Sequence, residues 1–269
     1  MTGSSEVTPA QVERAVRDVR TAGYAVLDRA LDPAALARLQ TAFDAHLDAV
    51  IAGGPARLHP TGTNRANVWV PLRPPFTDPE IVADPVVLAV VRELLGEGFV
   101  CSYYASDTAF PGSEYQPVHL DEAPLFPGLG VTLPPWSIVL DIPLVDFRAD
   151  NGPLDIWAQG THLIPDTGLL PTEPAEGGPE ARRSPIQRYA EELGPTPLLL
   201  PAGSLLVRDT RTWHRGTPNR STERRSMLAL VYSRPWNVIH TLPMAASVRG
   251  GLVEPVRGLF RNVFVEEAG

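Results

Sequence analysis

A histidine and an aspartate lie two residues apart, at His119 and Asp121, in the stretch QPVHLDEAPLFPG. On a strand, side chains two residues apart point to the same face, so we expect these two groups to aim together. A neutral imidazole and a carboxylate are two of the three ligands of a 2-His-1-carboxylate facial triad, which holds non-haem Fe(II) and leaves coordination positions open. The alternative is a polar pair at a strand end, because an isolated H-x-D triplet is a weak motif.

The third ligand of such a site would be a histidine further along the chain, on a neighbouring strand. The remaining candidates are His46, His59, His162, His214 and His240. His214 is the best placed, since it lies in VRDTRTWHRGTPNRS, a strand-to-turn stretch directly before the next predicted strand. Taken alone, His214 fits a surface or hydrogen-bonded histidine better, so its assignment depends on the whole set.

Arg225 follows His214 by eleven residues, at the start of RSMLALVY. If Met227 and Ala229 face inward, the period of two turns Arg225 inward as well. A buried arginine cannot shed its charge and needs an anion, which a dicarboxylate co-substrate would supply in a bidentate pair. The alternative is that both arginines of ERRS are solvated charges at a strand end, and this interpretation suits Arg224 best.

The elements that must position these residues change character near residue 100. Before it, three segments have helical periodicity, each with a capping residue and a proline at its start, and YAVLDRAL predicts a short strand between the first two. After it, β-branched and aliphatic runs bounded by turn residues predict strands without strong helices between them. These runs are WSIVLDIPLVDF, PTPLLLPAGSLLVRD and RRSMLALVYSRPW. The pattern favours a mainly β fold with flanking helices, an antiparallel sandwich or barrel.

No internal repeat or clean linker divides the chain, so we predict one domain over residues 1–269. Residues 1–100 would form a mostly helical support and residues 101–240 the β-helix core. The long polar stretch at 165–197 predicts an excursion over the mouth of the barrel that resembles a lid.

Composition narrows the class of protein. The 269 residues include 31 acidic and 23 basic side chains, a formal net charge of −8, which argues against a nucleic-acid partner. The single cysteine, Cys101, allows neither a disulfide framework nor a cysteine-based zinc site, and the first residues do not read as a secretory signal. We therefore expect a cytoplasmic protein with a small-molecule substrate and no membrane association, whose oligomeric state the sequence leaves open.

The motifs QPVHLD, DNGPLDIWAQGTH and WHRGTPN, with an arginine eleven residues past the distal histidine, resemble the phytanoyl-CoA dioxygenase family of Fe(II)/2-oxoglutarate-dependent oxygenases. The likeness spans roughly residues 100–235 and is greatest to bacterial natural-product members of the kanamycin B dioxygenase type. It implies a double-stranded β-helix, or jelly-roll, with N-terminal helices. It also implies His119, Asp121 and His214 as iron ligands, Arg225 as the clamp on the distal carboxylate of 2-oxoglutarate, and O₂ as the other co-substrate.

Further site residues follow less directly. Gln116 matches a position that contacts the co-substrate in some relatives, or it is a strand-edge glutamine facing solvent. Glu122, Asn67 and Trp213 are candidate substrate contacts, with Glu122 suited to meet an amine. The chain has AQGTH where the family usually has P-G-S-H, a departure in a turn segment.

The resemblance implies hydroxylation of an unactivated C–H bond of a small metabolite in secondary metabolism, with release of succinate and CO₂. Desaturation and ketone formation are variants of the same chemistry. Asp121 argues against halogenation, because halogenating relatives have a small residue at that position. The rival interpretations are a cupin-like metal-dependent isomerase or hydrolase, and a non-catalytic barrel that binds a small molecule.

Overall fold

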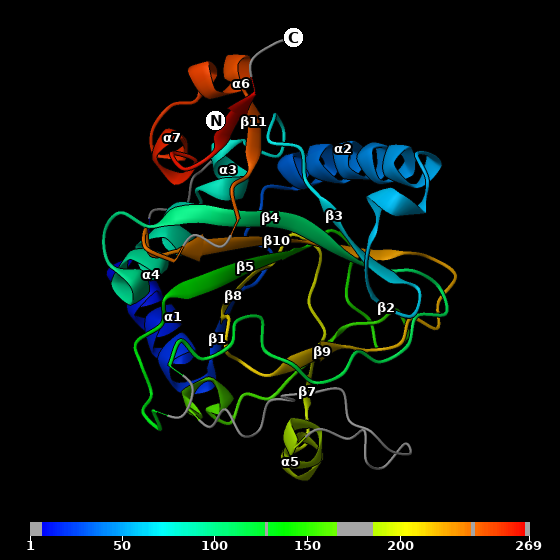
Figure 1. Cartoon of the computed structure of the whole chain (residues 1–269), viewed down its shortest axis with the longest axis vertical. Coiled ribbons are helices and arrows are strands. Elements are labelled where there is room, and N and C mark those ends of the chain that lie inside the picture. Colours follow the sequence, from blue (N-terminus) through cyan, green and yellow to red (C-terminus); the bar gives the residue numbers. More distant parts are fainter. Residues whose placement is uncertain (1–6, 127–128, 166–184, 238–239, 267–269) are drawn as a thin grey trace.

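Two antiparallel sheets face one another, with helices on the outer side of the larger sheet (Figure 1). The structure is a computed structural model, and it describes residues 7–126, 129–165, 185–237 and 240–266. The larger sheet has seven strands in the order β1-β8-β5-β10-β4-β3-β2, and the smaller has three in the order β7-β6-β9. β11 and β12 pair separately as parallel strands.

The strands of the larger sheet are β1 (Tyr24–Leu27), β2 (His59–Gly62), β3 (Arg65–Trp69), β4 (Val100–Ala109), β5 (Ser137–Pro143), β8 (Leu205–Asp209) and β10 (Arg225–Ser233). The smaller sheet contains β6 (Leu154–Ile156), β7 (Thr196–Leu198) and β9 (His214–Gly216), and the separate pair is β11 (Pro243–Ala245) and β12 (Phe264–Glu266). The helices are α1 (Pro9–Ala22), α2 (Pro33–Ala52), α3 (Pro79–Val82), α4 (Pro85–Leu95), α5 (Pro185–Leu193), α6 (Ala246–Gly251) and α7 (Val256–Leu259). Two short 3₁₀ turns, η1 (Pro55–Arg57) and η2 (Thr161–Leu163), complete the set.

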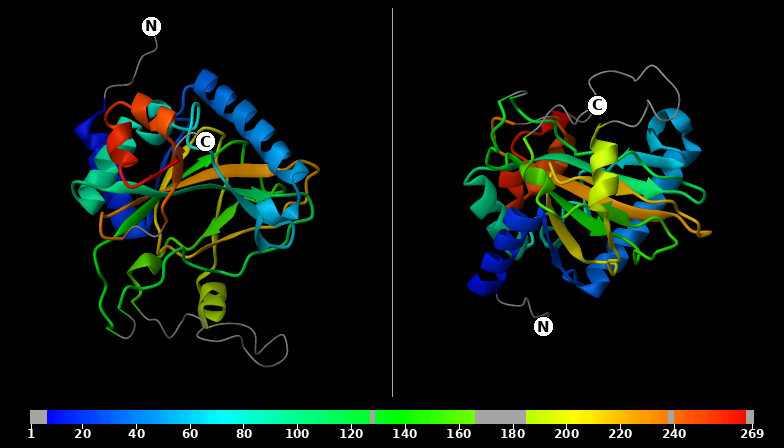
Figure 2. Two further views of the ribbon diagram at one scale, coloured as in Figure 1. Left: turned by 45° about the horizontal axis from the view of Figure 1, so that its top comes forward. Right: turned by 90° about the horizontal axis from the view of Figure 1, so that it is seen from below.

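The predicted helix starts are confirmed by their caps. Asp32 accepts hydrogen bonds from the backbone amides of Ala34 and Ala35, at 2.9 and 3.1 Å, and Asp84 caps α4 in the same way. Each cap satisfies amides that the first turn of a helix leaves without intrahelical partners. The view turned by 45° in Figure 2 shows these N-terminal helices gathered on one side of the larger sheet.

The period of two divides the long strands between two environments. On β10, Leu228, Leu230 and Tyr232 pack into the core shared with the N-terminal helices. Of the alternate residues of β10, Met227, Ala229 and Val231 line a cavity on the other face. The inward direction predicted for Met227 and Ala229 is therefore confirmed, and the site lies between the two sheets.

Two expectations about the fold need correction, and the first hundred residues also hold strands that the sequence did not predict. Besides the expected helices and short strand, β2 and β3 extend the larger sheet next to β4. Residues 117–122 are not a regular strand: only His119 makes a β-bridge, to His214. Strands β1 and β2 are the edges of the larger sheet, and those of the smaller sheet are three residues long, so the expected barrel is not closed.

Part of the predicted lid lies outside the described residues, namely 166–184. Within the rest of that stretch, Pro185–Leu193 forms α5, which buries Ile186 and Ala190 in a cluster with Val118, Trp157 and Trp213. Whether residues 165–197 cover the site remains a prediction. In the part of the chain that the structure describes, no helix has the length and apolar character needed to span a membrane.

Candidate metal and co-substrate site

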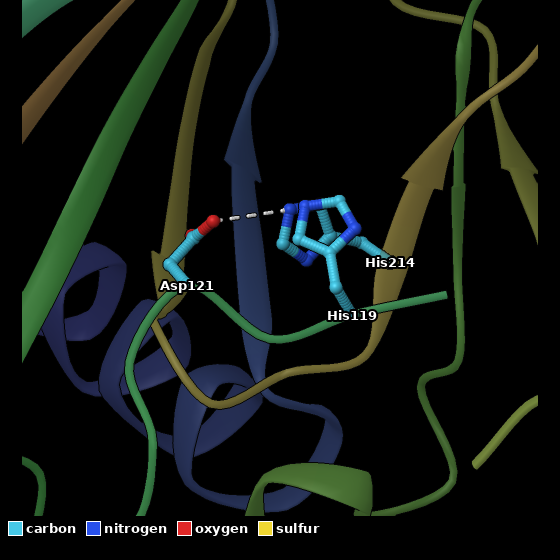
Figure 3. A group of neighbouring side chains, drawn as sticks. All are labelled: His119, Asp121 and His214. Atoms are coloured by element: carbon cyan, nitrogen blue, oxygen red, sulfur yellow. Dashed lines mark ion pairs between the residues drawn. The ribbon is translucent and has the colours of Figure 1, made fainter. Parts of the chain in front are cut away.

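His119, Asp121 and His214 converge at one point between the sheets (Figure 3). One ligand atom from each residue lies within 4.8 Å of those from the other two. Reciprocal backbone hydrogen bonds of 3.0 Å join His119 to His214, and the Asp121 amide donates to the carbonyl of Thr210 at 2.8 Å. These hydrogen bonds hold the H-x-D segment alongside β9 and the turn before it. They bring His119 and Asp121 close to His214 without a regular strand.

Both imidazoles present the same nitrogen to the centre of the site. The Nδ1 atom of His119 lies 2.9 Å from the carbonyl oxygen of Pro117, and that of His214 lies 2.9 Å from the carbonyl of Thr212. A carbonyl only accepts, so we assign the ring proton to Nδ1, which leaves the Nε2 lone pair free in each ring. Arg208 also lies 3.2 Å from Nδ1 of His214, but the shorter carbonyl contact decides the tautomer.

Asp121 is held from behind by a buried arginine. Nη1 of Arg208 donates to Oδ2 of Asp121 at 2.8 Å, while Oδ1 lies 3.3 Å from Nε2 of His214. Arg208 also pairs with Asp141 at 3.3 Å, and both of these side chains are almost fully buried. We call Arg208, Asp121 and Asp141 the metal-end cluster. Its pairing fixes one oxygen of Asp121 and leaves the other for a ligand at the centre.

The protonation states suit metal binding. Burial and the neighbouring His214 lower the pKa of His119 to about 4, so its imidazole is neutral at physiological pH. Burial alone would raise the pKa of Asp121, but the Arg208 guanidinium and the adjacent histidines outweigh it and hold that pKa well below its usual range. Burial raises the pKa of Asp141 although Arg208 opposes the shift.

The donor set fits a divalent transition metal. Two imidazole nitrogens and one carboxylate oxygen are the ligands of the facial triad, and a metal held by three protein atoms keeps positions open for other ligands. The two carboxylates of the metal-end cluster share a single guanidinium, so the cluster is also short of positive charge. The residues present therefore suit Fe(II) in both donor type and charge.

Arg225 lies fully buried at the other end of the site. Its Nε donates to the carbonyl of Gly152 at 2.8 Å, and its Nη1 lies 3.2 Å from Oδ2 of Asp107. Its Nη2 has no hydrogen-bond partner within the described ranges of the chain. Burial lowers the pKa of Arg225 to about 10, which leaves the guanidinium charged at neutral pH. Its neighbour Arg224 instead makes ion pairs with exposed aspartates of α2.

A cavity of about 310 Å³ connects the two ends. The candidate metal ligands and Asp107 line it, whereas Arg225 lies behind Asp107 and is not part of its wall. Most of the residues that line it are of polar type, although their apolar atoms contribute much of the wall. Its other polar members are Thr61, Asn67, Ser102, Tyr103, Ser106, Gln116, Glu122, Asp141, Arg208, Thr210 and His240.

The remaining predicted site residues divide into two groups. Asn67, Glu122 and Gln116 line the cavity. The amide of Gln116 is engaged at both ends, since it donates to the carbonyl of Thr61 at 3.0 Å and accepts from the amide of Gly216 at 2.8 Å. Trp213 lies elsewhere, buried beneath α5 in a cluster with Trp157, so the structure does not bring it to the substrate cavity.

Sequence reasoning missed several cavity residues. Arg208 and Asp141 each interrupt an apolar strand, in LLVRD and SIVLDIP, and a charged residue on the inward face of such a run was the available signal. His240, which follows the last long strand, and Tyr103 of β4 also line the cavity. No sequence pattern pointed to either of them as a cavity residue. Burial raises the pKa of Tyr103 to about 12, so its hydroxyl stays protonated in the cavity wall.

The family assignment follows from a match over most of the chain. The model of the phytanoyl-CoA dioxygenase (PhyH) family matches residues 19–227. The chain belongs to the phytanoyl-CoA dioxygenase family. The resemblance carried by the motifs is thereby confirmed, and with it the enzyme class, the Fe(II)/2-oxoglutarate-dependent oxygenases.

Solved structures share the fold at low sequence identity. AviO1 from Streptomyces viridochromogenes Tue57 has a TM-score of 0.60 and 21% identity, over 85% of this chain and 97% of that protein. The epimerase SnoN, in complex with Fe³⁺, alpha-ketoglutarate and nogalamycin RO, has a TM-score of 0.57 and 20% identity, over 84% of this chain and 85% of SnoN. The carbocyclase SnoK from nogalamycin biosynthesis has a TM-score of 0.57 and 18% identity, over 87% of this chain and 86% of SnoK.

Proposed function

We propose that this member of the phytanoyl-CoA dioxygenase family is an Fe(II)/2-oxoglutarate-dependent oxygenase that hydroxylates a C–H bond of a small metabolite. The observation that carries the proposal is the convergence of His119, Asp121 and His214, each with one free ligand atom directed to a shared centre. The proposed co-products are succinate and CO₂.

The protein's contribution at the metal end is to fix ligand geometry. The carbonyls behind the two imidazoles set their tautomers, and Arg208 restrains the carboxylate of Asp121. Such contacts behind the ligands orient them and tune the metal. When bound, iron and 2-oxoglutarate together supply an oxidant that removes a hydrogen atom from the substrate.

At the opposite end, we assign Arg225 to the distal carboxylate of 2-oxoglutarate. Its buried charge and its unpartnered Nη2 among the described residues support this role. The cavity wall between the ends would hold the substrate, with Glu122 and Asn67 as polar contacts and Gln116 as support for the β9 backbone. Holding the reacting C–H bond near the metal and limiting water access are the tasks that the wall would perform.

Natural-product biosynthesis is the proposed setting, because two of the structural neighbours come from a biosynthetic pathway of this kind. Those neighbours are named as an epimerase and a carbocyclase, so inversion of a stereocentre or ring closure is a second candidate outcome of the same hydrogen removal. Turnover under ¹⁸O₂ distinguishes the outcomes. Succinate takes up one ¹⁸O atom in every case; hydroxylation predicts a second ¹⁸O atom in the metabolite product, whereas epimerisation or ring closure predicts none there.

The test of the proposed function is co-substrate consumption that depends on a metabolite. The purified protein is supplied with Fe(II), ascorbate and 2-oxoglutarate, and succinate is measured across a panel of candidate metabolites. We expect slow background succinate release that at least one metabolite accelerates. Absence of any 2-oxoglutarate-dependent succinate, with metal shown to be bound, would favour a cupin-like isomerase or hydrolase or a binding protein.

A further inference from the structure

Two buried arginines lie at the clamp end, behind the cavity wall, and share one carboxylate. Arg65 of β3 and Arg225 of β10 both have side chains with 0% exposure, and each places Nη1 3.2 Å from the same oxygen, Oδ2 of Asp107. We call these three residues the clamp-end cluster. Two positive charges and one negative charge leave a net charge of +1 in a buried position. Uncompensated buried charge is costly, so the cluster is short of one anion.

Other contacts of the cluster do not supply that anion. Nη2 of Arg65 donates to the carbonyl of Thr217 at 2.7 Å, and Nε of Arg225 donates to the carbonyl of Gly152 at 2.8 Å. These partners are neutral. Within the described part of the chain, Nε of Arg65, Nη2 of Arg225 and Oδ1 of Asp107 have no hydrogen-bond partner.

The guanidinium of Arg65 packs against the backbone of β9 at Gly216. Gly216 lies two residues after His214, and a Cβ atom at Gly216 would come within 2.5 Å of the Arg65 guanidinium carbon. The lack of a side chain at Gly216 therefore makes room for the guanidinium beside the strand that carries a proposed metal ligand. Arg65 is therefore closely packed within the clamp-end cluster, although it lies in the region that the sequence predicted to be mostly helical support.

We propose that Arg65 completes the co-substrate site as a positioning residue: because Arg65 shares Asp107 with Arg225, the cluster keeps the net positive charge that one further carboxylate needs. The inference rests on the proposed function. With the distal carboxylate of 2-oxoglutarate bound, the cluster has two positive and two negative charges and is neutral. Without Arg65, Asp107 alone would neutralise Arg225, and the incoming carboxylate would meet no net positive charge.

The test compares two ligands that differ only in the distal carboxylate. Binding of 2-oxoglutarate and of 2-oxopentanoate, which has the same five-carbon chain, is measured calorimetrically on the Fe(II)-loaded protein without oxygen. For Arg65→Gln we expect roughly tenfold weaker binding of 2-oxoglutarate and unchanged binding of 2-oxopentanoate, because the clamp-end cluster then has no net positive charge. Arg220→Gln, which breaks the exposed ion pair with Glu114, is the matched control and should change neither affinity.

A second change of charge, at Asp107, makes the test more specific. Asp107→Asn raises the cluster from +1 to +2 and should tighten 2-oxoglutarate binding several-fold, since a competing carboxylate is removed. The double variant Arg65→Gln/Asp107→Asn returns the cluster to +1 and should recover most of the affinity that Arg65→Gln loses. A purely structural role for Arg65 predicts no such recovery.

Different outcomes test the inference about Arg65 and the proposed co-substrate separately. Equal losses for both ligands in Arg65→Gln, or a double variant no better than that single variant, would overturn the inference. If Arg65→Gln does not fold, Asp107→Asn decides, and weaker binding of 2-oxoglutarate in that variant overturns it. Wild-type protein that does not prefer 2-oxoglutarate to 2-oxopentanoate would instead overturn the proposed co-substrate.

Discussion

The two ends of the cavity carry opposite charge imbalances. In the metal-end cluster two carboxylates surround one guanidinium, and in the clamp-end cluster two guanidiniums surround one carboxylate. Each imbalance has the sign that its proposed ligand would correct, a divalent cation at one end and a carboxylate at the other. The comparison teaches that each cluster is incomplete in a specific way, and that this incompleteness points to its ligand.

The largest effect is expected at the metal end, from Asp121→Ala. This change removes a proposed metal ligand and leaves Arg208 paired with Asp141 alone. Changes behind metal ligands already cost about 10–100-fold, so loss of a ligand should reduce succinate production by more than about 100-fold. Asp48→Ala, at an exposed ion pair with Arg224, is the control. Near-normal turnover by Asp121→Ala would remove this residue from the ligand set.

At the clamp end, Arg225→Ala should raise the KM for 2-oxoglutarate by roughly 10–100-fold, in line with loss of a charged hydrogen bond. Arg224→Gln is the matched control one residue away, because its ion pairs lie on the surface. The KM is obtained from succinate formation at saturating Fe(II). An unchanged KM in Arg225→Ala would show that another cation binds the distal carboxylate, and the contrast between the two ends would then not hold.

Arg208→Gln should affect the metal end selectively. The variant leaves Oδ2 of Asp121 without its charged donor, so we expect Fe(II) affinity to fall roughly tenfold. The preference for 2-oxoglutarate over 2-oxopentanoate should persist, because the clamp-end cluster is untouched. Titration with Fe(II) under anaerobic conditions measures the first effect and calorimetry the second. Loss of the ligand preference with full metal affinity would show that the two ends are not separate.

Acid should produce the smallest effect, confined to the metal end. In the folded protein His119 has a pKa of about 4, against an ordinary value of 6.5. Between these values the unfolded chain binds a proton that the folded protein does not, so the free energy of unfolding falls as the pH decreases through this window. Arg225, with a pKa of about 10, keeps its charge throughout.

Urea unfolding of the metal-free protein at pH 4.5, 5.5 and 6.5 measures this dependence. His119→Gln removes the titrating group, so its unfolding free energy should change less with pH than that of the wild type. Parallel pH profiles for the two proteins would show that His119 is not held neutral in the fold.

Residues that follow a local period were predictable from the sequence. The caps at Asp32 and Asp84, and the inward direction of β10, rest on rules that act over a few residues. The candidate metal ligands came from residue types and spacing, and the structure places them together by bridging two segments about a hundred residues apart.

Contacts between residues on strands far apart in the chain could not be predicted from the sequence. Arg65 reaches the site because β3 pairs with β4 at the far side of the larger sheet, and no local pattern encodes that pairing. Asp107 and Arg208 depend on which strands become neighbours of β10 and β5. Trp213 shows the converse: it precedes a proposed ligand in the chain, yet it turns away from the cavity and is buried under α5.

The central claim is that one metal ion joins His119, Asp121 and His214 and that 2-oxoglutarate binds beside it. The most direct measurement is the absorption spectrum of the Fe(II)-loaded protein during anaerobic titration with 2-oxoglutarate. We predict a metal-to-ligand charge-transfer band that saturates at one equivalent per chain and is missing in both His214→Ala and Asp121→Ala. An equal band in either variant, or no band in wild-type protein with iron bound, would contradict the account.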